Sequence, residues 1–275
     1  MRDGSPQVPS LTATRETVTA SLADVAAHID TLLRVAEVTD YPTALNGVQV
    51  SHRGPVHGIA AAVDASVRTI DGAITAGANL LIVHHGLFWA GAQHVKGRAY
   101  ERMQRLFMHD IAVYSAHLPL DAHEIHGNSR LLASALGLVA SAGFAPFYGV
   151  ACGVRGTSDV ATAGLHERLR VFAREHGGDA RATPFDQQRR TRVWAICTGA
   201  GANQDTLREA TDSGVDTLIV GEGPHWTAVD AMDSGLAVLY GGHYATETLG
   251  VRSLADHVGR KFDLPWTFVP SPTGL

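Results

Sequence analysis

The sequence contains very few cysteines. Cys152 and Cys197 are the only two in 275 residues, which is too few for a disulfide framework or for a zinc site built from thiolates. This shortage favours a reducing, cytoplasmic setting. Long apolar runs are lacking as well. Stretches such as LLIV and GIAAAV are too short to span a bilayer, so we expect no membrane association.

Several common catalytic motifs are also missing. The sequence has no glycine-rich phosphate loop with its lysine, no GxSxG turn and no Cys–His nucleophile motif. Basic residues are not in excess, because 22 Lys and Arg stand against 27 Asp and Glu, for a formal charge of −5 at pH 7. This balance argues against nucleic acid as a partner. Residues 1–20 lack the apolar core of a secretory signal, and we expect them to form a flexible leader.

Histidine, by contrast, is abundant. The chain has fifteen histidines, and metal binding is one common reason for such an excess, although the excess alone proves nothing. Hydrophobic residues make up 45% and charged residues 18% of the chain, a balance typical of a globular protein. The length suits one large domain or two smaller ones.

Two segments of the sequence recur in the same order. The stretch GIAAAVDASVRTIDGAITAGANLLIVHHGLFW predicts a strand over 59–63, a helix from residue 67 and a buried strand over 80–83. The stretch WAICTGAGANQDTLREATDSGVDTLIVGEGPHW repeats this pattern. With a constant offset of 137 residues, Gly77, Val83, Gly86 and Trp89 recur as Gly214, Val220, Gly223 and Trp226.

A second pair of segments carries acid and imidazole side chains. The stretch ending in His117 and Asp121 recurs 126 residues later, ending in His243 and Glu247. General similarity between βαβ units would not reproduce His-x-x-x-acid after both later strands. We therefore predict a duplicated α/β unit, with a first repeat over residues 21–145 and a second, intertwined with it, over 146–275.

These repeats place metal-ligand side chains after strands. In open α/β sheets, ligands bind beyond the carboxyl ends of the strands, and a twofold relation between the repeats would bring those ends together. Imidazole and carboxylate groups without thiolates bind zinc, manganese, iron or nickel and leave room for water. Each motif alone is common in ordinary structure, but their joint placement favours a site. We predict that two divalent ions are bound by His84, His85, Asp121, His243 and Glu247.

Other residues receive weaker predictions. Glu222 and His225 follow the strand that repeats the one before His85, and they are candidates for substrate contact or proton transfer. His117 is a candidate ligand, a group that orients a ligand, or a proton carrier. Structural roles are expected for five more side chains: Asp64 as a helix N-cap or a cleft-edge residue, Trp89 and Trp226 as packed aromatics more than pocket rims, and His123 and His126 as solvated loop residues.

Five ordered motifs together resemble one known family. They are NGVQV at 46–50, GANLLIVHHGLFW ending at Trp89, YSAHLPLDAH at 114–123, GEGPHW from Gly221 and GGHYATETLGVRSLA from Gly241. Over residues 21–275 the chain resembles the Nif-three-like family of dinuclear-metal proteins, often labelled GTP cyclohydrolase I type 2 homologues.

The resemblance implies a fold and a site. The implied fold is a mixed α/β structure of two intertwined lobes, here without a large inserted domain between them. The implied ligands are the same five side chains, with Glu247 bridging the two ions, and the implied assembly is a homohexamer.

Two functions remain open. One is a metal-dependent hydrolase that uses metal-activated water on a small molecule, such as the nucleotide GTP, an amide, a cyclic amidine or a phosphoester. The other is a non-enzymatic metal-binding adaptor or metal-handling protein that interacts with regulatory partners.

Overall fold

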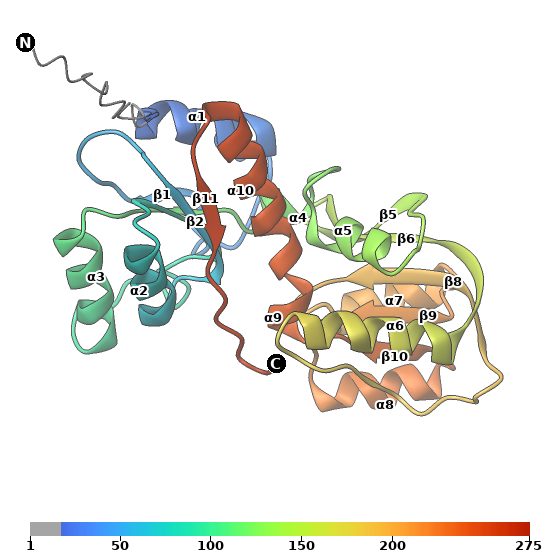
Figure 1. Cartoon of the computed structure of the whole chain (residues 1–275). Coiled ribbons are helices and arrows are strands. Elements are labelled where there is room, and N and C mark those ends of the chain that lie inside the picture. The colour runs from blue at the N-terminus through green and yellow to red at the C-terminus, as the bar shows by residue number, and fades with distance from the viewer. Residues whose placement is uncertain (1–17) are drawn as a thin grey trace, which may run out of the picture.

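The protein has two lobes, each built on one mixed β-sheet (Figure 1). The computed structural model describes residues 18–275. The predicted leader, residues 1–20, lies outside the described residues except for its last three, of which Ala20 bridges Val56 in antiparallel fashion. None of the helices over residues 18–275 has the length and apolar character needed to cross a membrane.

The first lobe holds a five-stranded sheet in the order β1-β4-β3-β2-β11. Strands β2, β3 and β4 are parallel, β11 extends the sheet in parallel beside β2, and β1 runs antiparallel to β4. The elements are α1 (Leu22–Leu33), β1 (Gly47–Val50), β2 (Ile59–Asp64), α2 (Val67–Thr75), β3 (Leu80–His85), α3 (Arg98–Met108), β4 (Ala112–Ser115), α4 (Leu118–Asp121), α10 (Thr248–Phe262) and β11 (Trp266–Phe268).

The second lobe holds a six-stranded sheet in the order β5-β6-β8-β9-β10-β7. Strands β8, β9 and β10 are parallel, and the outer strands are antiparallel to their neighbours. The elements are α5 (Asn128–Ala135), β5 (Ala142–Phe147), β6 (Val150–Ala161), α6 (Thr162–Glu175), β7 (Arg181–Ala182), β8 (Arg190–Cys197), α7 (Gln204–Asp212), β9 (Thr217–Val220), α8 (His225–Asp233), β10 (Ala237–Tyr240) and α9 (His243–Thr246).

The two parallel strand groups are copies of one unit, as predicted. In each, three strands alternate with two helices, and α2 and α7 begin 137 residues apart and are nine residues long. Both helices start with a reciprocal capping box, formed by Ser66 with Thr69 and by Asn203 with Thr206. The same local chemistry therefore starts the equivalent helix in both lobes.

Both faces of each sheet are covered by helices, which explains why the central strands are apolar throughout. Along β3, Leu80 and Ile82 pack on the side of α1 and α10, whereas Leu81 and Val83 pack on the side of α2 and α3. Because strand side chains alternate between faces, a strand buried on both sides needs no polar position. The second sheet repeats this arrangement between α5 and α6 on one face and α7 and α8 on the other.

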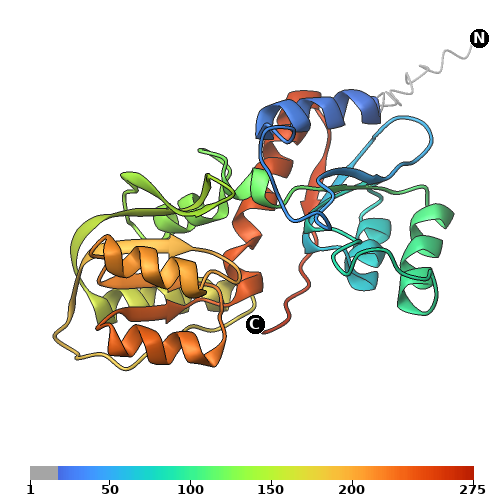
Figure 2. The same cartoon turned by 180° about the vertical axis from the view of Figure 1, so that it is seen from behind.

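The lobes exchange helices, which makes them intertwined. Helix α10, from the end of the chain, places Val251, Leu254 and Val258 in the core of the first lobe, and Figure 2 shows it beside α1. Helix α5, from the first half, places Leu132 in the core of the second lobe. The predicted boundary between residues 145 and 146 falls inside β5, which pairs along its length with β6 in the second sheet.

The start of the first lobe follows its local sequence. The Ser21 hydroxyl accepts a hydrogen bond from the Asp24 backbone N–H at 3.0 Å, which caps α1. Gly47 has a φ of 102°, and the chain turns there into β1 directly after Asn46. This turn matters for the site because the Asn46 side chain carbonyl accepts a hydrogen bond from the backbone N–H of His117.

Candidate metal centre

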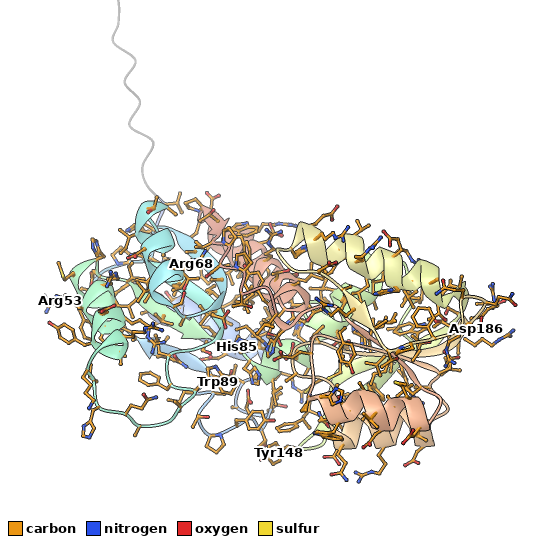
Figure 3. The ribbon with its side chains drawn as sticks, turned by 90° about the horizontal axis from the view of Figure 1, so that it is seen from below. Arg53, Arg68, His85, Trp89, Tyr148 and Asp186 are labelled. Carbon is orange, nitrogen blue, oxygen red and sulfur yellow. The ribbon has the colours of Figure 1, made fainter. Side chains whose placement is uncertain are left out.

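The five predicted ligands meet at one place between the lobes. His84 and His85 end β3, Asp121 ends α4, His243 begins α9, and Glu247 lies between α9 and α10. Figure 3 shows His85 at the junction of the two lobes. The carboxylate of Glu247 joins the set, with distances of 3.6 Å from Oε1 to His84 Nε2, 3.3 Å from Oε2 to His85 Nε2 and 3.1 Å from Oε2 to His243 Nε2. Asp121 Oδ2 lies 3.4 Å from His84 Nε2.

Four imidazoles at the centre share one orientation, with Nδ1 held by an oxygen acceptor. The pairs are His84 with the Ala116 carbonyl (2.8 Å), His85 with Asp64 (2.9 Å), His117 with Asp40 (2.9 Å) and His243 with Glu222 (2.7 Å). An acceptor without a proton requires the neutral imidazole to carry its hydrogen on Nδ1. The lone pair of each ring is then on Nε2, which is the arrangement that metal-binding histidines commonly use.

Within residues 18–275, two buried atoms at the centre have no hydrogen-bond partner. They are His84 Nε2 and Glu247 Oε2, on side chains that are fully or almost fully buried. A buried polar atom without a partner is costly, and a buried carboxylate oxygen especially so. A cation between these atoms would remove the cost, so the donor set fits a metal ion.

Two overlapping groups of side chains could each hold one ion. The first comprises His84, His85 and His117, and the second comprises His85, His243 and Glu247. Within each group, one ligand atom from every residue lies within 4.8 Å of the others. The sequence offered three roles for His117: a ligand, a group that orients a ligand, or a proton carrier. Its position in the first group makes it a ligand candidate.

The charges at the centre are strongly coupled. Burial disfavours the charged form of His84, yet the carboxylates of Asp121 and Glu247 raise its pKa well above the ordinary value. Burial also opposes charge on His243, but Glu247 and Glu222 raise its pKa to about 9. For Glu247, burial is outweighed by the imidazoles of His85 and His84, which lower its pKa well below the ordinary value. Protons are therefore favoured on His84 and His243, and a metal ion bound at these side chains would release them.

The second lobe contributes space for Glu247. Gly199 has a φ of +62°, and a Cβ there would lie 2.0 Å from Glu247 Oε1. Gly221, which occupies the repeat position of His84, approaches Gly199 so closely that a Cβ would lie 2.5 Å from the Gly199 carbonyl oxygen. The duplication is therefore asymmetric at the centre, because the first lobe has His84 and His85 where the second has Gly221 and Glu222.

The remaining predicted site residues are placed differently. Glu222 contacts the centre through His243, whereas His225 begins α8, is exposed and does not line the cavity at the centre. Asp64 is at the cleft edge beside His85, and Ser66 is the N-cap of α2. Sequence reasoning offered both roles for Asp64, and the structure selects the cleft-edge role.

Asp40 is a site residue that the sequence analysis missed. Its carboxylate accepts hydrogen bonds from the Asn46 side chain at 2.8 Å and the Leu118 backbone at 2.9 Å, in addition to its contact with His117. Burial alone would raise its pKa, but the contact with His117 and these donors lower it. Asp40 lies in an irregular segment 77 residues before His117 in sequence, and no spacing pattern links the two.

A cavity of about 1250 Å³ opens from the centre. His85, His117, Asp121, His243 and Glu247 are among the residues that line it. Trp89 lines it as well, which corrects the expectation of a packed core aromatic, and Trp226 is 44% exposed rather than packed. The lining also includes Tyr41, Leu118, Ala145, Pro146, Phe147 and Cys152, together with residues of α7.

The expectation that His123 and His126 are solvated is wrong for His126. Its side chain is buried against α10, where Ser253 Oγ lies 2.7 Å from its Nδ1. His257 and His28 extend this second histidine cluster, with their Nε2 atoms 3.0 Å apart. Burial and the neighbouring histidines lower the pKa of His126 to about 4. The apolar surface of α1 and α10, rather than the local sequence, removes this side chain from water.

The fold and the centre define a class: a two-lobed, duplicated α/β protein with a histidine- and carboxylate-rich site that could hold metal. A family model described as Duf34/NIF3 (NGG1p interacting factor 3) matches residues 20–273. The chain therefore belongs to the Duf34/NIF3 family, as the motifs in its sequence predicted.

Individual relatives support this membership over most of the chain. A protein of Halobacterium salinarum named GTP cyclohydrolase 1 type 2 homolog is 39% identical over 260 residues, covering 92% of this chain and 99% of the relative. A protein of Deinococcus radiodurans with the same name is 36% identical over 242 residues, covering 86% and 88%. The crystal structure of TTHA1606 from Thermus thermophilus aligns with a TM-score of 0.79 at 34% identity, covering 93% of this chain and 100% of that one.

Proposed function

We propose that the chain is a metal-dependent hydrolase that holds two divalent ions between its lobes and cleaves a small organic substrate. The observation that carries this proposal is the shared anchoring of His84, His85 and His243, whose Nδ1 atoms are held by oxygen acceptors and whose Nε2 atoms are left for a metal. The name of the curated relatives, GTP cyclohydrolase 1 type 2 homolog, supports a related cleavage of carbon–nitrogen bonds.

The proposed ligands are His84, His85, Asp121, His243 and Glu247. Glu247 suits a bridging role, because Oε1 faces His84 while Oε2 faces His85 and His243. Its burial, and the lack of a hydrogen-bond partner for Oε2 among the described residues, favour a cation beside that oxygen. Imidazole and carboxylate ligands accept zinc, manganese, iron or nickel, and availability selects among them.

A bound divalent ion supplies Lewis acidity and lowers the pKa of its water from about 16 to about 7. In hydrolysis of a carbon–nitrogen bond, the oxygen of water bonds to carbon, the carbon–nitrogen bond breaks, and one proton of the water must reach the leaving nitrogen. We assign this proton transfer to His117, which lines the cavity and whose ring is fixed by Asp40. Glu222 acts as a positioning residue through His243.

His225 has no contact with the centre that would carry a proton, and it is exposed at the start of α8. Its predicted part in proton transfer stays a prediction from the sequence. The variant His225→Ala tests this prediction directly, because the loss of an essential proton carrier would lower turnover at least a hundredfold.

The cavity favours an enzyme over an adaptor. Small-molecule sites are concave spaces of about 300–1,000 Å³ with apolar walls and a few polar groups. The cavity here, at about 1250 Å³, is somewhat larger than this range, and four of the five predicted ligands are among the residues that line it. An adaptor would present its recognition groups on an outer surface and would have no need for a metal centre open to an internal space.

The decisive experiment compares Glu247→Ala with Glu175→Ala. Glu175 is an exposed residue of α6, far in sequence from the centre, and serves as the matched control. The metal-reconstituted proteins are screened for turnover of nucleotides and cyclic amides, and their metal content is measured by elemental analysis. We expect Glu247→Ala to lose bound metal and turnover while the control keeps both. Full metal content in Glu247→Ala would refute the ligand assignment, and no turnover by the wild type on any class would favour the adaptor.

A further inference from the structure

The cavity has one aromatic wall made by Tyr41, Trp89 and Phe147. These side chains come from the segment after α1, the loop after β3 and the end of β5, so both lobes contribute. The ring centroids of Tyr41 and Phe147 are 4.7 Å apart, and those of Tyr41 and Trp89 are 6.1 Å apart. All three residues line the cavity, and Tyr41 is 44% exposed. The rings of Phe147 and Trp89 are inclined to that of Tyr41 by 45° and 62°, so a flat ring could stack on one of the three and contact the others edge-on.

The aromatic wall runs up to the metal centre. The ring of Trp89 has its centroid 4.6 Å from that of His117 and 5.6 Å from that of His85. Figure 3 shows Trp89 close to His85 at the junction of the lobes. A ring stacked on the wall would thus have its edge toward the proposed ligands.

The part of the cavity formed by α7 is acidic. Asp205, Glu209 and Asp212 of α7 line it. Among the lining residues within the described chain, Arg208 is the one Lys or Arg, and its guanidinium is paired with Asp205 at 2.8 Å. No unpaired guanidinium or ammonium group among these described lining residues would receive a phosphate.

The N-terminus of α7 also lines the cavity, and helix N-termini can bind anions. Here that capacity is already used. The Asn203 side chain carbonyl accepts hydrogen bonds from the backbone N–H groups of Asp205 and Thr206, at 3.0 and 3.1 Å. The carboxylate of Asp205 lies in the first turn, where it offsets the positive end of the helix dipole.

The metal centre offers no surplus positive charge. Two divalent ions would bring a charge of +4. The proposed ligands Asp121 and Glu247, together with the carboxylates that hold the imidazoles, bring −5. Those three further carboxylates belong to Asp40, Asp64 and Glu222. A polyanion such as a triphosphate would therefore be repelled from both ends of the cavity.

We propose that the cavity binds a planar nitrogen heterocycle that carries no phosphate groups and is neutral or cationic, with its ring against Tyr41, Trp89 and Phe147. This inference rests on the proposed function only in placing the bond to be cleaved at the centre. It differs from what the name of the relatives suggests for them, because it excludes a nucleoside triphosphate as the preferred ligand.

Binding to the full, metal-loaded chain is measured by calorimetry for a panel of purine and pyrimidine nucleosides, their triphosphates, and pterin as a fused ring without phosphate. We expect at least one phosphate-free ring to bind at least tenfold more tightly than any triphosphate, with the preference shrinking at high salt. A triphosphate that binds more tightly than every phosphate-free ring overturns the proposal, as does the failure of every phosphate-free ring to bind.

Variants separate stacking from charge. Trp89→Ala and Tyr41→Ala should weaken ring binding at least tenfold at unchanged metal content, and Trp89→Phe should restore most of it. Trp226→Ala and Tyr100→Ala are the matched controls, because both residues are exposed and do not line the cavity. Unchanged ring affinity in both wall variants contradicts the proposal.

The acidic side is tested by Asp212→Asn, with Asp233→Asn at the exposed end of α8 as control. The cavity variant should bind triphosphates severalfold more tightly and phosphate-free rings unchanged, and equal effects of both variants would contradict the charge argument. Ring binding without any turnover would leave this inference standing and count against the hydrolase. GTP turnover that is unchanged in Trp89→Ala and Tyr41→Ala would contradict this inference and support the hydrolase.

Discussion

Gly199 offers a direct perturbation of the centre without removal of any ligand. Its φ of +62° lies in the left-handed region, and an added Cβ would be 2.0 Å from Glu247 Oε1. Gly214 is the matched control, because its φ of +69° is equally left-handed but an added Cβ meets nothing within 4 Å. Substituting Ala at either position costs about 1–2 kcal/mol for the backbone conformation.

Only Gly199→Ala must also displace the buried carboxylate of Glu247 from its imidazole partners. Breaking a buried charged pair costs about 3–5 kcal/mol, so we expect Gly199→Ala to lose about 3 kcal/mol more than Gly214→Ala in metal-free protein. Urea unfolding in the presence of a chelator measures this difference. Elemental analysis of the reconstituted proteins should find less than one ion per chain in Gly199→Ala and wild-type content in Gly214→Ala. Equal stability and equal metal content in the two variants would refute the proposed position of Glu247.

Three further predictions concern Asp40, the second histidine cluster and the assembly. Asp40→Asn should lower turnover about 10- to 100-fold, because it weakens the contact that orients His117; a wild-type pH–rate profile and kcat would contradict this. The folded-state pKa of His126, about 4, is below the unfolded value of 6.5, so stability is lost as pH falls from 6.5 toward 4. After allowance for partial solvation, this loss of unfolding free energy is about 2 kcal/mol. In urea titrations, His126→Gln should remove most of this dependence of stability on pH. Light scattering should give a homohexamer, six times 29.1 kDa; a monomer mass would contradict it.

Local sequence patterns were sufficient to predict the duplicated unit and the gathering of the five ligand candidates. Capping-box residues mark the helix starts at Ser66 and Asn203, and continuous apolar runs mark the buried strands. His117 and Asp121 have the same spacing as His243 and Glu247, and the two pairs occupy equivalent positions, because each follows a parallel strand at a short helix.

Other features depend on contacts between distant segments and leave no local signal. Asp40 and Asp64 become anchors for imidazoles only when the chain segments approach in three dimensions. The exchange of α5 and α10 between lobes is invisible to periodicity, because both helices have ordinary apolar faces that fit either sheet. His126 is in a polar stretch of sequence, and its burial results from packing against α10 rather than from its neighbours.

Anomalous scattering from crystals grown with a single divalent metal tests the central claim most directly. The account predicts two peaks between the lobes, about 3.5–4 Å apart, one within reach of His84 Nε2 and the other within reach of His243 Nε2, with Glu247 between them. A fully loaded crystal in which no peak lies near Glu247 would contradict the account.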